Sequence, residues 1–262
     1  MYIDIIIPTL NDFRISRTFS SIKKNNLYHK LKLIIIDGGS SDKYITLLNS
    51  NLRQQDTLIS ENDNGIFDAL NKGILNSTSD IVYWLGSDDF INPDFDFQQV
   101  FDFYKKDKNL ALLSYRTIYF KNNKITRNIE FNNPTLSKYI YGNHFPHFST
   151  FIRGSLCRKF QFNLEYKIAS DYDFFFYFLK NKFKCLSFPK TLVYVEEGGN
   201  SNSLLNNLVE LFKILKKHTN FIIAFIGITL RYFFKIISKI SYNSKKDEFY
   251  FKSILLKIKN EK

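Results

Sequence analysis

Short apolar runs alternate with amphipathic stretches through the first third of the chain. The runs have the composition of buried strands and recur about every 20 to 30 residues. Strands are predicted over residues 3–8, 32–37, 57–60 and 80–85, and helices over 14–24, 42–51 and 65–75. Alternation of this kind builds βαβ units, so the sequence predicts an α/β fold, Rossmann-like, with a mostly parallel central sheet flanked by helices.

The second part of the chain has a different pattern. Residues 110–129 predict antiparallel strands that turn at Lys-Asn-Asn-Lys, and residues 141–156 predict a loop that leads into another strand. Residues 169–181 predict a helix with an acidic start, and 186–203 a strand followed by a glycine-rich loop. After Ser203 apolar residues follow the helical period, at Leu204, Leu205, Leu208, Leu211, Phe212 and Leu215.

Polar residues stand where the first four predicted strands end. In parallel sheets ligands bind beyond the carboxyl ends of the strands. The residues at those ends are Thr9, Asp37, Glu61 with Asp63, and Asp88 with Asp89. All four ends therefore carry groups suited to a polar ligand.

The pair Asp88 and Asp89 is unusual because two adjacent carboxylates repel each other and require a compensating charge. Mg²⁺ and Mn²⁺ prefer carboxylate oxygen and leave coordination positions for phosphate, so a divalent cation is one interpretation. A solvated Asp-Asp turn before Pro93 is the other.

Two further loops carry candidate binding groups. Residues 34–42, with two glycines and a Ser/Asp pair, fit either a close approach to a ligand or a capped turn between strand and helix. They lack the spacing of the Walker loop and of the dinucleotide fingerprint. Lys72 follows an acidic, amide-rich helix start, where it fits either a phosphate contact or an ordinary surface lysine.

Charge is concentrated in the C-terminal part of the 262-residue chain. The net charge is +12, and residues 213–262 account for +9 of it, with twelve basic and three acidic residues. The chain is 44% hydrophobic, as expected for a globular protein, and 17% aromatic. The N-terminal sequence is not that of a signal peptide, and the two cysteines have no zinc spacing, which favours a reducing, cytoplasmic location.

Several motifs follow one another in register: "IIIPTLN", "IIIDGGSSD", "SENDNGIFDALNKGI", "WLGSDDFINPD", "PHFSTFIRGSL" and "ASDYDFFFYFL". Together they resemble the family 2 glycosyltransferases of the GT-A fold, in particular bacterial enzymes that build capsule, exopolysaccharide or lipopolysaccharide O-antigen. The resemblance spans residues 1–203, with a nucleotide-binding half over 1–95 and an acceptor half over 96–203. It implies a metal-dependent inverting transferase that moves a sugar from a nucleotide-sugar donor to a saccharide acceptor.

The resemblance also implies roles on the donor side. Pro8 and Thr9 match the strand end beside the nucleotide base, and Asp37 the acid that contacts base or ribose. Asp63 matches a loop on the nucleotide side.

Asp88 and Asp89 match the last two positions of the family's metal motif, so that Asp88 would face the ribose and Asp89 would hold Mn²⁺ or Mg²⁺. Asp171 matches the acid that deprotonates the acceptor, as an inverting transfer requires. It also fits a helix cap. His147 would contact the acceptor or the diphosphate, although a hydrogen-bonded loop histidine is equally consistent. Residues 198–200 fit either a loop that closes over the donor diphosphate or an ordinary turn.

The sequence departs from the family pattern at three positions. Gly38 replaces a second acid in the first aspartate loop, which affects base selectivity. Ser87 stands where many relatives carry an acid in the metal motif, so two carboxylates remain. Ser170 replaces the glutamate that commonly precedes the proposed base.

Residues 204–262 form a basic, amphipathic helical tail. An apolar stripe edged with Lys and aromatic residues predicts a helix at the surface of an anionic membrane. Packing on the catalytic domain or on a second subunit is the alternative. The membrane interpretation implies a peripheral enzyme on the inner face of the plasma membrane, acting on a polyprenyl-linked acceptor.

Two other functions fit parts of the pattern. A sugar-phosphate nucleotidyltransferase also uses a Rossmann-like sheet and a metal, but residues 8–19 lack its glycine-rich loop. A non-enzymatic lipid-binding or nucleic-acid-binding protein would explain the basic tail. Acidic strand ends would repel a phosphate backbone, so no nucleic-acid partner is expected.

Overall fold

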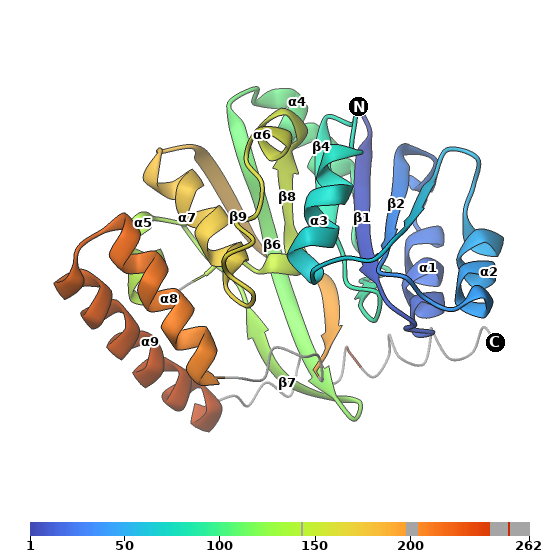
Figure 1. Cartoon of the computed structure of the whole chain (residues 1–262). Helices are drawn as coiled ribbons and strands as arrows, with labels where there is room; N and C mark the ends of the chain where they lie inside the picture. Colours follow the sequence, from blue (N-terminus) through green and yellow to red (C-terminus); the bar gives the residue numbers. More distant parts are fainter. Residues whose placement is uncertain (143, 198–203, 242–250, 252–262) are drawn as a thin grey trace.

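The computed structural model describes residues 1–142, 144–197, 204–241 and 251. The predicted glycine-rich loop at 198–200 and most of the segment after 241 lie outside the described residues. Within them, one mixed sheet runs through the molecule in the order β3-β2-β1-β4-β8-β6-β9-β5, with β7 paired to β6 (Figure 1). The predicted α/β fold with a central sheet and flanking helices is confirmed.

The first half is a parallel sheet joined by crossover helices. Its strands are β1 (Ile3–Thr9), β2 (Leu31–Asp37), β3 (Thr57–Ser60) and β4 (Ile81–Trp84), and its helices are α1 (Ile15–Lys23), α2 (Asp42–Asn51) and α3 (Ile66–Leu75). All seven elements match the predictions to within two residues at their ends. β1 pairs with β2 and β4, and β2 with β3, all in parallel. The carboxyl ends of these strands therefore lie at one edge of the sheet.

The second half adds antiparallel and parallel pairings. β6 (Leu110–Lys121) and β7 (Lys124–Ile129) form the predicted hairpin, β8 (Thr150–Arg153) lies between β4 and β6, and β9 (Lys184–Glu196) runs parallel to β6. α7 (Ser170–Lys180) is the predicted acidic-start helix. Elements that the sequence analysis did not predict are β5 (Phe90–Ile91), α4 (Gln98–Lys106), α5 (Leu136–Tyr141) and α6 (Gly154–Lys159).

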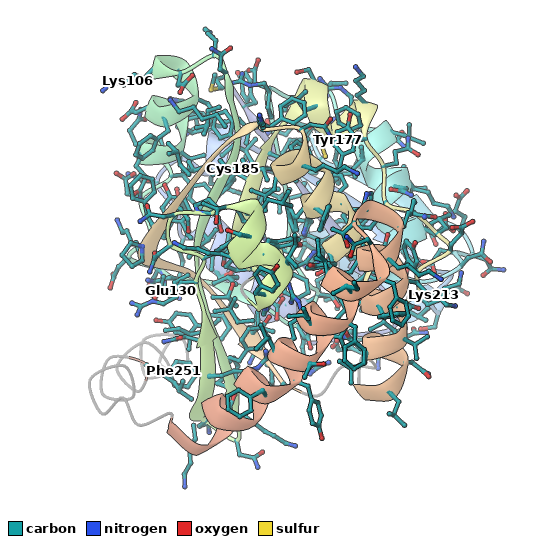
Figure 2. All side chains as sticks on the ribbon, turned by 90° about the vertical axis from the view of Figure 1, so that its left-hand side faces the viewer. Lys106, Glu130, Tyr177, Cys185, Lys213 and Phe251 are labelled. Carbon is teal, nitrogen blue, oxygen red and sulfur yellow. The ribbon has the colours of Figure 1, made fainter. Side chains whose placement is uncertain are left out.

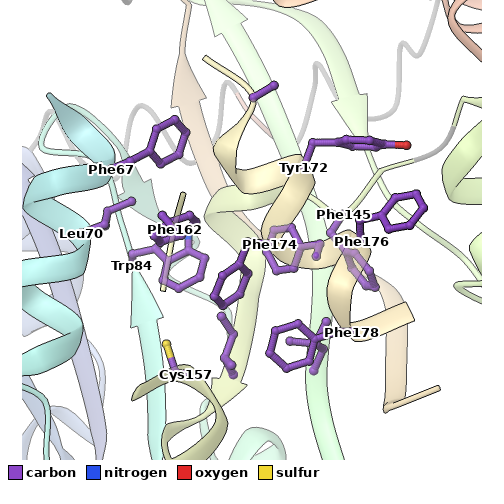
Figure 3. Packing of buried hydrophobic residues seen from close by; sticks show 14 of the residues in the cluster. Phe67, Leu70, Trp84, Phe145, Cys157, Phe162, Tyr172, Phe174, Phe176 and Phe178 are labelled. Carbon is purple, nitrogen blue, oxygen red and sulfur yellow. The ribbon is translucent and has the colours of Figure 1, made fainter. Parts of the chain in front are cut away.

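Alternating side chains of the strands build a separate core on each face of the sheet. On β1, Ile6 packs with α3 and α7, whereas Ile5 and Ile7 pack with α1, α2 and α4. The first core is rich in aromatic rings, among them Trp84, whose ring centroid lies 5.2 Å from that of Phe162 and 5.8 Å from that of Phe174 (Figure 3). Large, buried rings of this kind make the sheet a rigid support for its loops.

The tail begins with α8 (Leu204–His218) and α9 (Phe221–Ser241), which lie side by side at one end of the molecule (Figures 1 and 2). Ile214, Leu215 and Ala224 are fully buried in the same core as α7. At Gly227 a Cβ atom would lie 3.0 Å from the carbonyl oxygen of Ile140, so glycine lets α9 approach α5 closely. One face of the tail is therefore attached to the rest of the fold.

None of the helices in the described part of the chain has both the length and the apolar character that crossing a bilayer requires.

Candidate active site

The chain turns sharply after β4, and the carboxylates of Asp88 and Asp89 both lie close to Gly86. The backbone N–H of Asp89 donates to the carbonyl oxygen of Gly86. A Cβ atom on Gly86 would lie 2.6 Å from Oδ2 of Asp89 and 3.2 Å from Oδ1 of Asp88. A side chain at position 86 would therefore have to displace the two carboxylates from these positions.

Asp89 is the most conspicuous group of the turn. Its side chain is buried, and neither carboxylate oxygen has a hydrogen-bond partner of normal geometry within the described residues. Burial and the neighbouring Asp88 raise the pKa of Asp89 well above its ordinary value, and the backbone near Gly86 and Glu196 offsets this only in part. A buried carboxylate without a partner is costly, and a bound cation would remove the cost.

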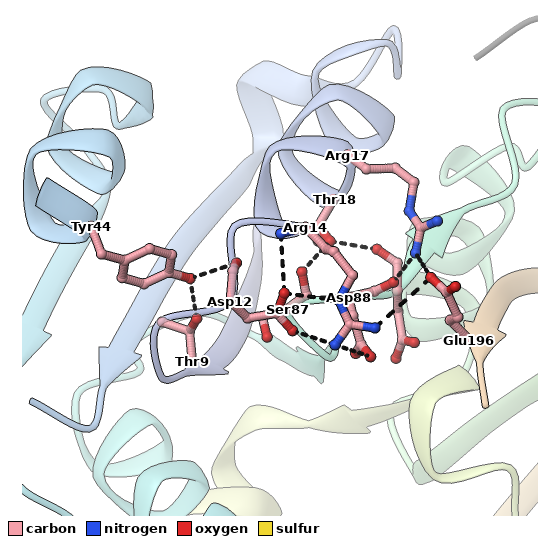
Figure 4. A network of polar contacts seen from close by, with 10 residues as sticks. Thr9, Asp12, Arg14, Arg17, Thr18, Tyr44, Ser87, Asp88 and Glu196 are labelled. Atoms are coloured by element: carbon pink, nitrogen blue, oxygen red, sulfur yellow. Dashed lines mark hydrogen bonds and ion pairs between the residues drawn. The ribbon is translucent and has the colours of Figure 1, made fainter. Parts of the chain in front are cut away.

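Two arginines of the first helical segment surround the acidic turn (Figure 4). Arg14 makes ion pairs with Asp12 at 2.7 Å and with Asp88 at 3.1 Å. Arg17 donates to the carbonyl oxygen of Asp88 and pairs with Glu196 of β9 at 2.8 Å. Burial raises the pKa of Asp88, and the charge of Arg14 opposes that rise.

Arg14 and Arg17 were not predicted to belong to the site. Their positions in the sequence could have identified them, because the two arginines stand one helical turn apart and come soon after a strand end that was predicted to bind a ligand. Thr18 completes the contact between the helix and the turn, since its hydroxyl donates to the carbonyl oxygens of Ser87 and Asp89.

The charge of this cluster suits a divalent cation. When ionised, the four acids Asp12, Asp88, Asp89 and Glu196 exceed the two arginines by two negative charges. Over the part of the chain that the structure describes, there is no group of three or more His, Cys, Asp or Glu side chains arranged as a metal site. Mg²⁺ is often bound by one or two carboxylates together with substrate phosphates, so the residues present fit an ion that arrives with a diphosphate.

The residues that were predicted to lie beside the nucleotide base are found together at the ends of β1 and β2. Thr9 lies beside Asp37 in the parallel register, and the N–H of Gly38 donates to the carbonyl oxygen of Thr9. A Cβ atom on Gly38 would lie 2.8 Å from Oδ2 of Asp63. Gly38 thus stands at a place where the carboxylate of Asp63 already occupies the space. Pro8 precedes Thr9 in β1, opposite Ile36.

Asp37 and Lys72 have structural partners. The fully buried carboxylate of Asp37 accepts hydrogen bonds from the backbone of Gly39 and Ser40 and from the hydroxyls of Ser40 and Ser60. Lys72 pairs with Glu61 at 2.9 Å and donates to the carbonyl oxygen of Asn62. Both residues shape the loops in which they lie, and their contacts with a donor stay predictions.

Asp171 lies in the first turn of α7, where its side chain is 32% exposed. Burial of the carboxyl is the main reason why the pKa of Asp171 rises to about 6. A pKa near neutrality suits a general base, because such a group is largely ionised at pH 7 and still accepts a proton readily. Its own backbone neighbour Tyr172 donates an N–H to Oδ1, so Oδ2 is the oxygen free of that bond.

His147 lies against Asp171, with Nδ1 3.7 Å from Oδ2, which is too long for a hydrogen bond. Burial lowers the pKa of His147 to about 3, so its imidazole is neutral. The ring packs on Trp84 with 5.3 Å between centroids. His147 is thus a buried neighbour of the proposed base, and its contact with acceptor or diphosphate stays a prediction.

Tyr119 of β6 was not predicted as a site residue. Burial raises the pKa of Tyr119 to about 12; the charge of Arg127 opposes that rise, and the charges of Asp89, Asp171 and Glu197 add to it.

A cavity of about 550 Å³ lies elsewhere, between the β5–α4 loop, β6 and β9. Arg116, Phe103 and Phe188 line it, and none of the predicted site residues does. It forms no part of the site described above.

Comparison with known proteins gives one family. The model of "Glycosyl transferase family 2" matches residues 4–186. A PGL/p-HBAD biosynthesis glycosyltransferase of Mycobacterium bovis is 25% identical over 248 residues, which cover 90% of this chain and 92% of the relative. An uncharacterized glycosyltransferase of Mycobacterium tuberculosis is 28% identical over 179 residues, 66% of either chain.

Solved structures share the fold. TarS 1–349 of S. aureus, in complex with UDP-GlcNAc, superposes with a TM-score of 0.65 at 16% identity, over 99% of this chain and 72% of that one. The chain spans 43% of a longer TarS structure. The mannosyltransferase PcManGT of Pyrobaculum calidifontis, in complex with GDP-Man and Mn²⁺, gives a TM-score of 0.57 at 14% identity, over 97% and 79%.

Proposed function

The chain belongs to glycosyltransferase family 2, and from that membership we propose that it moves a sugar, with inversion, from a nucleotide-sugar donor to a hydroxyl of a saccharide acceptor. The observation that carries the proposal is the unpartnered, buried carboxylate of Asp89 beside Asp88. An anion in that position is suited to a cation that also binds a diphosphate. Family membership does not favour the nucleotidyltransferase or the non-enzymatic alternative.

Asp89, assisted by Asp88, would hold Mn²⁺ or Mg²⁺. When bound, such an ion supplies positive charge for the departing nucleoside diphosphate. Solved relatives support a donor of this class, since one is in complex with UDP-GlcNAc and another with GDP-Man and Mn²⁺. Arg14 and Arg17 hold the acidic turn in place, and Thr9, Asp37 and Asp63 surround the position proposed for the base.

Asp171 would accept the proton of the acceptor hydroxyl as that oxygen attacks C1 of the sugar. A transferase of this kind needs one carboxylate base and a stabilised leaving group, whereas a glycosidase needs two carboxylates that flank the bond. Asp171 stands in the second half of the chain, away from the donor loops in sequence, which leaves room for an acceptor site between them.

The proposal predicts donor hydrolysis by the full chain, with water as acceptor. A panel of UDP-, GDP- and dTDP-sugars is incubated with Mn²⁺, and release of nucleoside diphosphate is measured. We expect release from one nucleotide class, at least about tenfold above the others, because a site that hydrogen-bonds one base rejects others strongly. Chelation of the metal should stop the release. Equal release without metal would contradict the metal assignment, and no release or binding of any donor would contradict the function.

The acceptor is proposed to be a polyprenyl-linked saccharide of capsule, exopolysaccharide or O-antigen synthesis, at the cytoplasmic face of the plasma membrane. The exposed face of the tail supports this. Phe221, Ile222, Phe225 and Ile226 of α9 are 43–68% exposed and lie on one helical face. The basic charge of residues 213–262 would complement anionic lipid headgroups. Attachment of the opposite face to α5 and α7 is compatible with this role.

The membrane proposal predicts co-sedimentation with vesicles that contain phosphatidylglycerol, weaker at high salt, and little binding to phosphatidylcholine alone. Phe225→Glu should reduce vesicle binding about tenfold or more, because a buried Phe contributes roughly 1.5–3 kcal/mol. Leu75→Glu is the control, since Leu75 is 63% exposed on α3, away from the tail. Equal loss in both variants, or none in Phe225→Glu, would contradict this docking surface.

A further inference from the structure

The first tail helix places a carboxylate against the chain that leads into α7. Glu210 of α8 accepts three backbone hydrogen bonds: from Lys167 at 2.9 Å, Ile168 at 2.9 Å and Ala169 at 2.8 Å. Ala169 is the N-cap residue of α7 and has no side-chain cap of its own. Glu210, from another helix of the same chain, therefore supplies the negative charge that a helix start favours, through charge-assisted hydrogen bonds.

The three residues that Glu210 holds come shortly before Asp171. From Ala169 the chain reaches Asp171 in two residues, within the first turn of α7. Any rotation of the segment 167–169 would move the carboxylate of Asp171 relative to the acceptor. A catalytic group that is misplaced by about 1 Å slows the reaction considerably. Fixing the backbone that leads into this turn would therefore keep Asp171 in a productive position.

The rest of α8 is anchored along α7. His218 contacts Asp173 with 2.6 Å between Nε2 and Oδ1, and its ring stacks on Phe176 with 4.7 Å between centroids. Ile214 and Leu215 of α8 are fully buried. Glu210 is thus held on a helix that is itself fixed to α7, which makes its three hydrogen bonds a rigid connection.

We propose that Glu210 is a positioning residue for sugar transfer, which holds the backbone at residues 167–169 so that Asp171 faces the acceptor hydroxyl. The inference rests on the proposed role of Asp171 as base. It gives the start of the basic tail a part in the active site, in addition to any contact with a membrane.

The charge of Glu210 provides a readout that separates positioning from simple stabilisation. Glu210 is the charged neighbour whose negative charge raises the pKa of Asp171, in addition to burial. The other titratable or charged groups around this turn come from several elements: His147 of η2 (His147–Ser149), Tyr119 of β6, Tyr139 of α5, Asp173 of α7 and Arg231 of α9. His147 is neutral above pH 4 or so, because burial lowers its pKa to about 3.

The test compares Glu210→Gln and Glu210→Ala with Glu165→Gln in the full chain. Glu165 lies in the same loop region, and its carboxylate accepts a hydrogen bond from the side chain of the neighbouring Asn163. Metal-dependent hydrolysis of the preferred nucleotide sugar is followed against pH. We expect Glu210→Gln to lower kcat about tenfold, with a donor KM within about twofold of wild type. In the plot of kcat against pH, the rise on the acidic side should move to lower pH, since loss of a negative neighbour lowers the pKa of Asp171. Glu165→Gln should leave all three quantities unchanged.

Glu210→Ala should show a larger fall in kcat because it removes every acceptor for the three N–H groups. If this variant does not fold, Glu210→Gln retains one oxygen acceptor and still tests the proposal. Wild-type kcat and pH profile in Glu210→Gln, alongside an inactive Asp171→Asn, would overturn the positioning role and leave the base assignment standing. A fall in thermal stability with no change in kcat or in its dependence on pH would also overturn it. Full activity in Asp171→Asn would overturn the base assignment and this inference with it.

Discussion

Asp89→Asn is expected to melt at a higher temperature than the wild type without metal, and to lose the stabilisation that Mn²⁺ and a nucleoside diphosphate give together. The first effect follows from the buried, unpartnered carboxylate, whose ionised form is disfavoured in the fold. The neutral amide has the same size and carries no charge. The second effect follows because the variant removes the oxygen donor proposed for the ion.

The size of the metal effect can be bounded. A ligand at one hundred times its Kd stabilises a protein by about 2.7 kcal/mol, which for a domain of this size raises Tm by about 5 °C or more. Thermal melts of wild type, Asp89→Asn and the surface control Asp102→Asn should be recorded with and without Mn²⁺ and the diphosphate. Asp102 lies on the exposed side of α4. Only Asp89→Asn should lose the shift.

The pH dependence of the metal-free stability gives a second check. The pKa of Asp89 is raised in the folded state, so protonation favours the fold and ionisation opposes it. The wild type should therefore lose stability relative to Asp89→Asn as pH rises above about 4, where the unfolded carboxyl ionises. A variant that melts lower than the wild type at neutral pH, or that keeps the Mn²⁺ shift, would show that Asp89 is a structural residue.

The strands of the first half could be predicted from sequence because they are buried on both faces. Each is a continuous apolar run, as in "IDIIIP" and "KLIIID", and the alternation of Ile5 and Ile6 between two cores is the structural counterpart. β5 could not be found, since two residues carry no periodicity. α4 had a readable pattern in Val100, Phe101 and Tyr104, which all face one core.

Local pattern could have marked Arg14 and Arg17 as candidates, but it does not show which distant residues they or Glu210 contact. Arg17 lies 71 residues before Asp88 and 179 before Glu196, and Glu210 lies 41 residues after Ala169. Such pairs are set by how the helices dock on the sheet. Motif order identified which acids matter, whereas the fold determines which cations and backbone groups surround them.

Asp171→Asn is expected to keep donor binding and to lose transfer by a factor of about 10² to 10⁴, which is the usual contribution of a general base. The amide keeps the shape of the side chain and accepts the N–H of Tyr172, but it cannot take a proton. The variant should therefore bind a nucleotide sugar with Mn²⁺ as tightly as the wild type. Calorimetry measures that binding, and release of nucleoside diphosphate measures the chemistry.

The pH profile identifies the titrating group. The pKa of Asp171 is raised to about 6, so wild-type activity should rise through pH 6 as the carboxylate forms. His147 is neutral across this range, so it adds no second step to the plot of activity against pH. The residual activity of Asp171→Asn should show no rise near pH 6. Asp96→Asn is the matched control, because Asp96 is exposed, accepts the N–H of Gln98 at the start of α4 and has no place in the proposed site.

The same variant also separates a base from a helix cap. An acid in a first turn stabilises a helix start by roughly 0.3–1 kcal/mol, so a purely structural Asp171 would change the melting temperature slightly and leave kcat intact. Asp96→Asn should behave in that way. If Asp171→Asn behaves like Asp96→Asn, with transfer at the wild-type rate and an unchanged rise in activity near pH 6, the proton acceptor is another group. Loss of kcat and of the rise near pH 6 together, with donor affinity retained, is the combination that only a base at position 171 explains.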